Sequence, residues 1–189
     1  MKKLPFLLLV MILSVPAFAQ QKTAVLVIDI QKFYFPGGSL PLVEPEKAAA
    51  NAARIVDKAR TGHIPVIFIQ HNSSTGMEIS GIVKPLPGET VFTKKEINSF
   101  YGTGLLEYLR KLNIDTLVIC GMQTHMCVEA AVRAAHDYGF KVTLVHDACA
   151  TRNLSFGGRE VAAADVQTAV MAALKNYATI VDTDEWTKK

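Results

Sequence analysis

Short apolar runs rich in β-branched residues alternate with stretches of helical periodicity along this chain, and this alternation limits its possible folds more than any other feature. The runs are almost continuously apolar, which is typical of strands buried on both faces of a parallel sheet. Parallel strands need long crossover connections, and the stretches between these runs are of helical type. The pattern therefore predicts a three-layer α/β/α fold with a doubly wound sheet of about six parallel strands. The predicted strands cover residues 23–29, 65–70, 90–93, 115–120, 141–146 and 178–182.

The stretches between the strands predict the helices. The first begins at Pro45, which suits a first helical turn, and ends at Gly62 after apolar residues at helical spacing. The polar tail after residue 182 is expected to fray. A polar loop with Gly and Pro over residues 71–88 is long enough to indicate a functional role. Further helices are predicted at residues 104–112, 124–138 and 158–174.

The composition fits one compact domain and gives no electrostatic reason for binding nucleic acid. The chain has 189 residues, of which 50% are hydrophobic and 20% charged, as in a single domain with a sizeable core. Its net charge of +3 includes Lys2 and Lys3, and without these two the remaining 18 basic residues face 17 acidic ones. Three cysteines are too few for a disulfide scaffold, and one thiol must stay unpaired within the chain.

Residues 1–19 have the order of a secretory signal. A basic pair is followed by an apolar run over residues 4–15 and by small residues ending at Ala19. A membrane anchor is the alternative, but the run is shorter than the roughly 20 apolar residues that a spanning helix needs. We therefore expect cleavage after Ala19, a domain over residues 20–189, a periplasmic or secreted location, and no membrane attachment after cleavage.

Reactive side chains follow three of the predicted strands. In doubly wound sheets the ligand site forms beyond the carboxyl ends of the strands, where Asp29, Lys94 and Cys127 stand. Cys127 falls at the start of a predicted helix, whose N–H groups and dipole would lower the pKa of its thiol. A nearby carboxylate could take the thiol proton, and a lysine between the two would make both anions tolerable. The sequence thus predicts a nucleophile, a base and a cation at one edge of the sheet.

The motifs around these residues resemble those of the isochorismatase-like cysteine hydrolases over about residues 23–182. They are Asp-x-Gln after the first strand, Lys-x-x-x-x-x-Phe followed by Gly-Thr-x-Leu, and Gly-x-x-Thr-x-x-Cys-Val before a helix. The resemblance implies a catalytic triad and no cofactor. The triad would be Asp29, Lys94 and Cys127. The motif residues are Asp29, Gln31, Lys94, Phe100, Gly102, Thr103, Leu105, Gly121, Thr124, Cys127 and Val128.

The same resemblance implies an oxyanion hole. The family places a cis peptide bond four residues before the cysteine, which falls here between Met122 and Gln123. The backbone N–H groups of Gln123 and Cys127 would then hold the oxyanion of a tetrahedral intermediate. Of two adjacent lysines, counting back from Phe100 favours Lys94 for the site, and strand alternation turns Lys95 away.

Aromatic and polar residues near these motifs are candidates for binding the substrate. Gln31, Phe33, Tyr34 and Phe35 follow Asp29 and could line the mouth of a pocket, as aromatic residues often do around small ligands. Packing beneath the long loop is the alternative for the aromatic residues. Phe100 is a similar case within the family pattern.

The histidines do not form a recognisable metal set. His125 is two residues from Cys127, a spacing that points the two side chains to different helix faces, so we interpret it as pocket wall or subunit contact. His71 lies near the position where nicotinamidases, the metal-binding members of the family, carry an acid and histidines. Residues 70–73 contain no acid and no second histidine, so we expect a site without metal.

The resemblance and the residue chemistry together predict an enzyme that hydrolyses an amide, ureide or N-carbamoyl C–N bond of a small molecule through a Cys127 thioester. Hydrolysis of isochorismate needs no thiol nucleophile, so the presence of Cys127 argues against that reaction. Hydrolysis of nicotinamide is disfavoured by the missing metal ligands. A periplasmic redox or binding protein with Cys127 as a sensor thiol is the alternative from another class. A dinucleotide site is not indicated, since no G-x-G-x-x-G follows the first strand. The family resemblance also implies a homo-oligomer.

Overall fold

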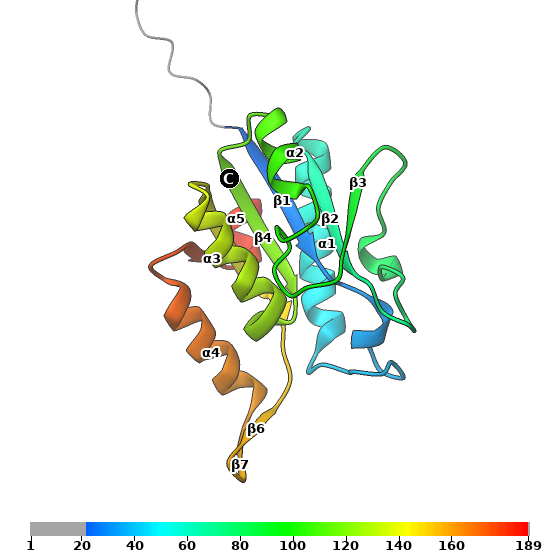
Figure 1. Ribbon diagram of the computed structural model, residues 1–189, viewed down its shortest axis with the longest axis vertical. Helices are drawn as coiled ribbons and strands as arrows, with labels where there is room; N and C mark the ends of the chain where they lie inside the picture. The colour runs from blue at the N-terminus through cyan, green and yellow to red at the C-terminus, as the bar shows by residue number, and fades with distance from the viewer. Residues whose placement is uncertain (1–21, 189) are drawn as a thin grey trace, which may run out of the picture.

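The computed structural model describes residues 22–188, and within them it confirms the predicted three-layer fold (Figure 1). All neighbouring strands of the main sheet are parallel, in the order β3-β2-β1-β4-β5-β8. The predicted signal over residues 1–19 lies outside the described residues. The strands of this sheet are β1 (Thr23–Ile28), β2 (Val66–His71), β3 (Thr90–Lys94), β4 (Thr116–Met122), β5 (Lys141–Ala150) and β8 (Thr179–Val181).

Helices cover both faces of the sheet because successive strand residues point to opposite sides. In β1, Val25 and Val27 pack towards α1 and α5, while Leu26 and Ile28 pack towards α2, α3 and α4. Figure 1 shows α3 and α4 in front of the sheet and α1 behind it. Within residues 22–188, no helix is long and apolar enough to cross a membrane. The helices are α1 (Pro45–Thr61), α2 (Leu105–Lys111), α3 (Glu129–Asp137), α4 (Ala163–Leu174) and α5 (Thr183–Thr187).

The strand order reverses between β1 and β4, and this switch point determines where a site can form. From β1 the chain adds β2 and β3 on one side, and then β4, β5 and β8 on the other. The connections that leave the ends of β1 and β4 therefore diverge and open a crevice. Asp29 follows β1, and Cys127 follows β4.

The region between β5 and α4 differs from the prediction. Residues 158–162, expected to begin a helix, belong instead to a hairpin of β6 (Leu154–Phe156) and β7 (Arg159–Val161) and its link to α4. Gly157 and Gly158 both have positive φ, of 58° and 75°, which suits a tight two-residue hairpin turn. The hairpin projects from the body of the protein (Figure 1).

Two other boundaries also differ. The tail after β8 does not fray but forms α5, because the Asp182 side chain accepts a hydrogen bond from the Glu185 N–H at 2.7 Å and caps the helix. Strand β5 continues beyond the predicted end at residue 146 to Ala150, so Cys149 lies on this strand.

Candidate active site

Three side chains from the carboxyl ends of β1, β3 and β4 meet inside the protein. Asp29 follows β1, Lys94 ends β3, and Cys127 lies in the turn after β4. The Lys94 Nζ atom is 2.8 Å from Asp29 Oδ2 and 3.2 Å from Cys127 Sγ. All three residues are buried, and Cys127 retains 5% of its exposure. The structure therefore groups the predicted base, cation and nucleophile.

The Lys94 ammonium is surrounded by acceptors. Besides Asp29 and Cys127, it donates to the Glu96 backbone oxygen at 3.1 Å and lies 3.1 Å from His71 Nδ1. An ammonium has three N–H donors and no acceptor, so four neighbours share three donors and hold the group in place. Lys95, the next residue, is exposed, as strand alternation predicts.

A glycine lets the ends of β1 and β4 approach closely. Gly121 pairs in register with Ile28 and has a φ of 136°. A Cβ atom at this position would lie 2.0 Å from the Ile28 backbone oxygen, so no other residue fits without displacing β1. Asp29 has a φ of 48°, a left-handed conformation that Asp adopts more readily than most residues. This approach places Asp29 beside the turn that carries Cys127.

The turn after β4 is wider than an α-helical turn. The Met122–Gln123 peptide bond is cis, at the position that the family resemblance implied. The Gln123 carbonyl then accepts the N–H groups of Met126 and Val128 at 3.1 and 3.2 Å. The segment predicted as one α-helix over residues 124–138 therefore begins with a π-helical turn (Thr124–Val128), and α3 follows it. Cys127 lies within this turn.

The Gln123 side chain is held between two other residues. Its Nε2 donates to Tyr34 Oη at 3.3 Å, and its Oε1 accepts from Arg152 Nε at 3.2 Å. Sequence reasoning missed Arg152, because β5 was expected to end at residue 146. With the strand ending at Ala150, Arg152 becomes a strand-end residue, which is the signal that could have found it.

Burial is the largest influence on the pKa values of Asp29 and Cys127. Desolvation raises the pKa of Asp29, although the Lys94 cation opposes the change. Desolvation, followed by the Asp29 charge, raises the pKa of Cys127 to about 12. The lowered thiol pKa expected at a helix start is therefore wrong, because removing the thiolate from water outweighs the nearby dipole and the Lys94 charge. At neutral pH, Cys127 is a thiol that needs a base.

The site contains residue types that often bind zinc, but an ammonium lies among them. Ligand atoms of Asp29, His71 and Cys127 are all within 4.8 Å of one another. Lys94 Nζ forms an ion pair with Asp29 and hydrogen bonds with His71 and Cys127. A divalent cation would have to displace this charge or force it to deprotonate. The geometry thus favours the lysine as the cation of the site.

Gln31, expected to bind substrate, supports the backbone instead. Its buried Nε2 donates to the backbone oxygens of His71 and Met77 at 3.0 and 2.6 Å. Its Oε1 accepts from the His71 N–H at 2.7 Å. Both amide hydrogens are used within the protein, so Gln31 joins the end of β2 to the long loop.

The phenylalanines expected at the pocket make mainly packing contacts within the protein. Phe100 packs against Tyr138 and Phe140, which follow α3 at its opposite end, so it is a core residue. Phe33 is also buried in the core, and its exposed edge joins Phe35 in lining a hollow of about 590 Å³ beside residues 36–39. Packing beneath the loop therefore accounts for most of these aromatic contacts.

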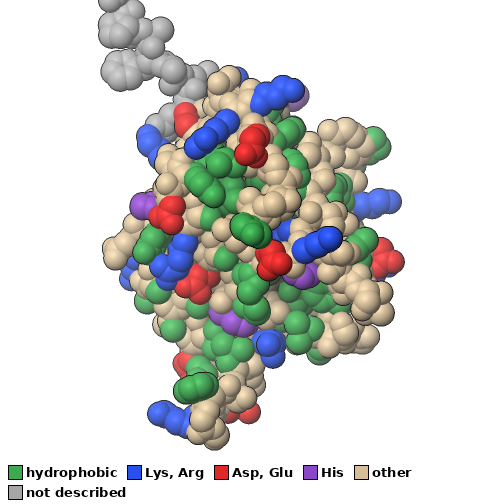
Figure 2. All heavy atoms as spheres, in the orientation of Figure 1, with side chains coloured by type: hydrophobic (Ala, Val, Ile, Leu, Met, Phe, Trp, Pro, Cys, Tyr) green, Lys and Arg blue, Asp and Glu red, His purple; other side chains and the backbone are tan. Residues whose placement is uncertain are grey.

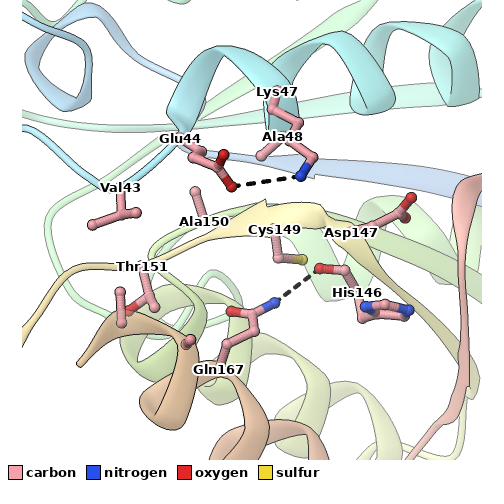
Figure 3. Close-up of a pocket in the computed structure, with 12 residues that line it drawn as sticks. Val43, Glu44, Lys47, Ala48, His146, Asp147, Cys149, Ala150, Thr151 and Gln167 are labelled. Carbon is pink, nitrogen blue, oxygen red and sulfur yellow. Dashed lines mark hydrogen bonds and ion pairs between the residues drawn. The ribbon is translucent and has the colours of Figure 1, made fainter. Parts of the chain in front are cut away.

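A separate hollow of about 240 Å³ lies between the starts of α1 and α4 and the end of β5 (Figure 3). Glu44 and Lys47 form an ion pair at 3.5 Å on one wall, and Gln167 donates to the His146 backbone oxygen at 2.9 Å on another. Cys149 also lies on this wall, but none of the three catalytic candidates does. This hollow is distinct from the Asp29–Lys94–Cys127 site.

Comparison with known proteins places the chain and its fold in one family. The model of the isochorismatase domain matches residues 23–185. An uncharacterised isochorismatase family protein of Bacillus subtilis is 42% identical over 178 residues, 88% of this chain and 99% of the relative. A crystal structure described as an isochorismatase hydrolase from Oleispira antarctica is 38% identical with a TM-score of 0.87, covering 92% of this chain and 100% of that one.

One further relative has a named activity. The streptothricin hydrolase of Streptomyces noursei is 32% identical over 171 residues, 82% of this chain and 57% of the relative. Members of the matched family are hydrolases. The chain belongs to the isochorismatase family.

Proposed function

We propose that this protein hydrolyses the C–N bond of a small amide, ureide or N-carbamoyl compound with Cys127 as the nucleophile. The observation that carries the proposal is the position of Lys94 Nζ, 2.8 Å from Asp29 Oδ2 and 3.2 Å from Cys127 Sγ, in a buried site. A buried carboxylate and thiol joined by one cation form a base and nucleophile pair without a histidine. The name of the streptothricin hydrolase relative supports hydrolytic chemistry for this chain.

The first half of the reaction forms a thioester. Because the pKa of Cys127 is raised to about 12, the thiol does not ionise beforehand, and Asp29 accepts its proton as Sγ attacks the carbonyl carbon. The N–H groups of Gln123 and Cys127 stabilise the resulting oxyanion. Asp29 then gives the proton to the departing nitrogen, the C–N bond breaks, and ammonia or an amine leaves.

The second half releases the acid. Asp29 accepts a proton from a water molecule, whose oxygen attacks the thioester carbonyl. The C–S bond breaks, and the proton returns from Asp29 to Cys127 Sγ. Throughout, the Lys94 ammonium offsets the negative charge that moves between the carboxylate and the sulfur. No metal or cofactor is needed for either half.

A screen for ammonia release tests this function. Purified protein is offered simple amides, ureides, N-carbamoyl amino acids, nicotinamide and isochorismate, with Cys127→Ala as the matched control. We expect turnover of at least one amide-type compound by the wild type alone. Isochorismate contains no nitrogen, so its hydrolysis is followed by release of pyruvate, and turnover by both proteins would move the assignment to the vinyl ether reaction. Peroxide reactivity of Cys127 without any hydrolysis would favour the sensor thiol.

We also propose that the protein is exported, because residues 1–19 have the order of a secretory signal.

We further propose that the protein forms a homo-oligomer through the β6–β7 hairpin. Phe156 on this hairpin is 92% exposed, and Figure 2 shows hydrophobic side chains on the projecting arm. The hairpin borders an apolar hollow that includes Val166, Val170 and His125. Exposed apolar patches of this kind often mark interfaces. Phe156→Asp should lower the molar mass measured by light scattering, and a monomeric wild type would contradict the proposal.

A further inference from the structure

His71 is the fourth side chain of the candidate site, and it lies at the end of β2. It pairs in register with Lys94 of β3, so their side chains are neighbours on adjacent strands. His71 Nδ1 lies 3.1 Å from Lys94 Nζ. The backbone supports the same pair, since the Asn72 N–H donates to the Lys94 oxygen at 2.8 Å.

The contact with Lys94 fixes the protonation of the imidazole. A charged lysine can only donate, so His71 Nδ1 must be the acceptor. The ring is then neutral, and its single proton is on Nε2. Burial, followed by the charge of Lys94, lowers the pKa of His71, which keeps the ring neutral to more acidic pH.

The backbone of His71 is held on both sides by Gln31. Its N–H donates to Gln31 Oε1 at 2.7 Å, and its carbonyl accepts from Gln31 Nε2 at 3.0 Å. Gln31 is fully buried, so this clamp is shielded from water. The clamp fixes the backbone position from which the His71 side chain reaches Lys94.

We propose that His71 is a positioning residue whose neutral Nδ1 orients the Lys94 ammonium between Asp29 and Cys127. With one N–H directed to His71 and another to the Glu96 oxygen, the remaining donor is shared by Asp29 Oδ2 and Cys127 Sγ. Lys94 then keeps a fixed place between base and nucleophile. The inference rests on the proposed function, because it assigns His71 a part in that reaction.

Protonation of His71 would remove this support. The charged groups that act on the ring are Lys94, Asp29 and Glu96, and Cys127 lies beside it. Imidazolium has no acceptor at Nδ1 and would repel the ammonium next to it. As pH falls through the pKa of His71, Lys94 would lose its orientation, and activity would fall with it. Asp29 contributes a separate loss, because it must be ionised to act as a base.

Two substitutions separate this role from simple packing. Asn places an oxygen near the position of Nδ1 and does not titrate, while Leu fills similar space without an acceptor. We expect His71→Leu to lose about 10- to 100-fold in kcat with little change in KM, as when a partner that orients a catalytic group is removed. His71→Asn should stay within about threefold of the wild type at neutral pH and lose the His71 part of the acid limb. His136→Leu, at the far end of α3, is the matched control.

A second measurement needs no substrate. Lys94 lowers the pKa of the Cys127 thiol relative to the value set by burial and Asp29, so a displaced lysine should slow alkylation. Iodoacetamide labelling of Cys127, followed by mass spectrometry at a series of pH values, should be at least about threefold slower in His71→Leu and near wild type in His71→Asn. Circular dichroism checks that both variants fold.

The outcomes distinguish the two proposals. Wild-type kcat and labelling rates in His71→Leu would overturn the role of His71 while leaving the hydrolase intact. Equal losses in His71→Asn and His71→Leu would also overturn it, since the acceptor would then not matter. Labelling that follows the expected order, in a protein that turns over no amide, would retain the positioning role and reject only the hydrolysis.

Discussion

Cys127 and Cys149 are both buried thiols with a pKa raised to about 12, yet their surroundings differ. Desolvation is the main cause of the raised pKa in each case. Cys127 has the Lys94 ammonium 3.2 Å from its sulfur, whereas the Cys149 thiol donates to the Val145 backbone oxygen at 3.3 Å. Within residues 22–188, no lysine or carboxylate is bonded to Cys149. We therefore expect the reactivity of a thiol in this protein to depend more on its neighbours than on its pKa.

The largest expected effect separates these two cysteines directly. Cys127→Ala should lower kcat by about 10⁴-fold or more, because the nucleophile is lost. Cys149→Ala should keep kcat within about threefold, at a stability cost of about 1 kcal/mol. Steady-state kinetics and thermal unfolding of both variants measure the contrast. Comparable losses in the two would show that the comparison is mistaken.

The neighbours of Cys127 should matter nearly as much as the thiol itself. Asp29→Asn removes the base, and Lys94→Ala removes the cation that holds it. Groups that act as one unit are not additive, so each variant should lose about 10³-fold or more in kcat. The double variant with Cys127→Ala should lose little beyond Cys127→Ala alone. Additive losses would indicate that the three residues act independently.

The pH profile should reflect the raised pKa of Asp29. The carboxylate must be ionised to accept a proton, and its pKa is raised by burial. Activity should therefore fall as pH decreases, and this fall should begin above the ordinary carboxyl value of about 3.9. In His71→Asn, the loss of activity that remains at low pH should come from protonation of Asp29 alone. If activity fell only at or below the ordinary carboxyl pKa, the claim that burial raises the pKa of Asp29 would be contradicted.

Chelation should have the smallest effect of all. Lys94 supplies the positive charge of the site, so treatment with EDTA should leave kcat unchanged, and elemental analysis should find no stoichiometric zinc or iron. Added zinc ions serve as the control, because they can reach the Asp29, His71 and Cys127 ligands only by displacing Lys94. Activity that disappears with chelator and returns with zinc would assign the cation role to a metal.

The sequence was sufficient for the sheet, which follows from periodicity, and for the grouping of Asp29, Lys94 and Cys127, which the strand ends indicated and the family resemblance implied. Buried parallel strands leave a continuous apolar pattern, and the switch point then determines which strand ends meet. Counting back from Phe100 in the family pattern favoured Lys94 over Lys95, and strand alternation then turned Lys95 away from the site.

Other features depended on contacts that no local pattern records. His71 directly follows the predicted strand over residues 65–70, but its contact with Lys94 depends on the register between two strands. The raised pKa of Cys127 depends on burial by distant segments, which outweighs the local helix start. The hairpin near Gly157 was missed for a different reason: its two adjacent glycines are a local hairpin signal, but the apolar residues after them continue at helical spacing and favoured a helix.

The most direct test of the account is detection of the Cys127 thioester. A substrate found in the ammonia screen is mixed with the enzyme, and the reaction is quenched with acid during turnover. The protein is then digested, and the mass of the peptide that contains Cys127 is measured by mass spectrometry. We predict a mass increase equal to the acyl group of the substrate, on Cys127 alone, and none in Cys127→Ala. Continued turnover without any adduct on Cys127, together with an active Cys127→Ala variant, would contradict the central claim.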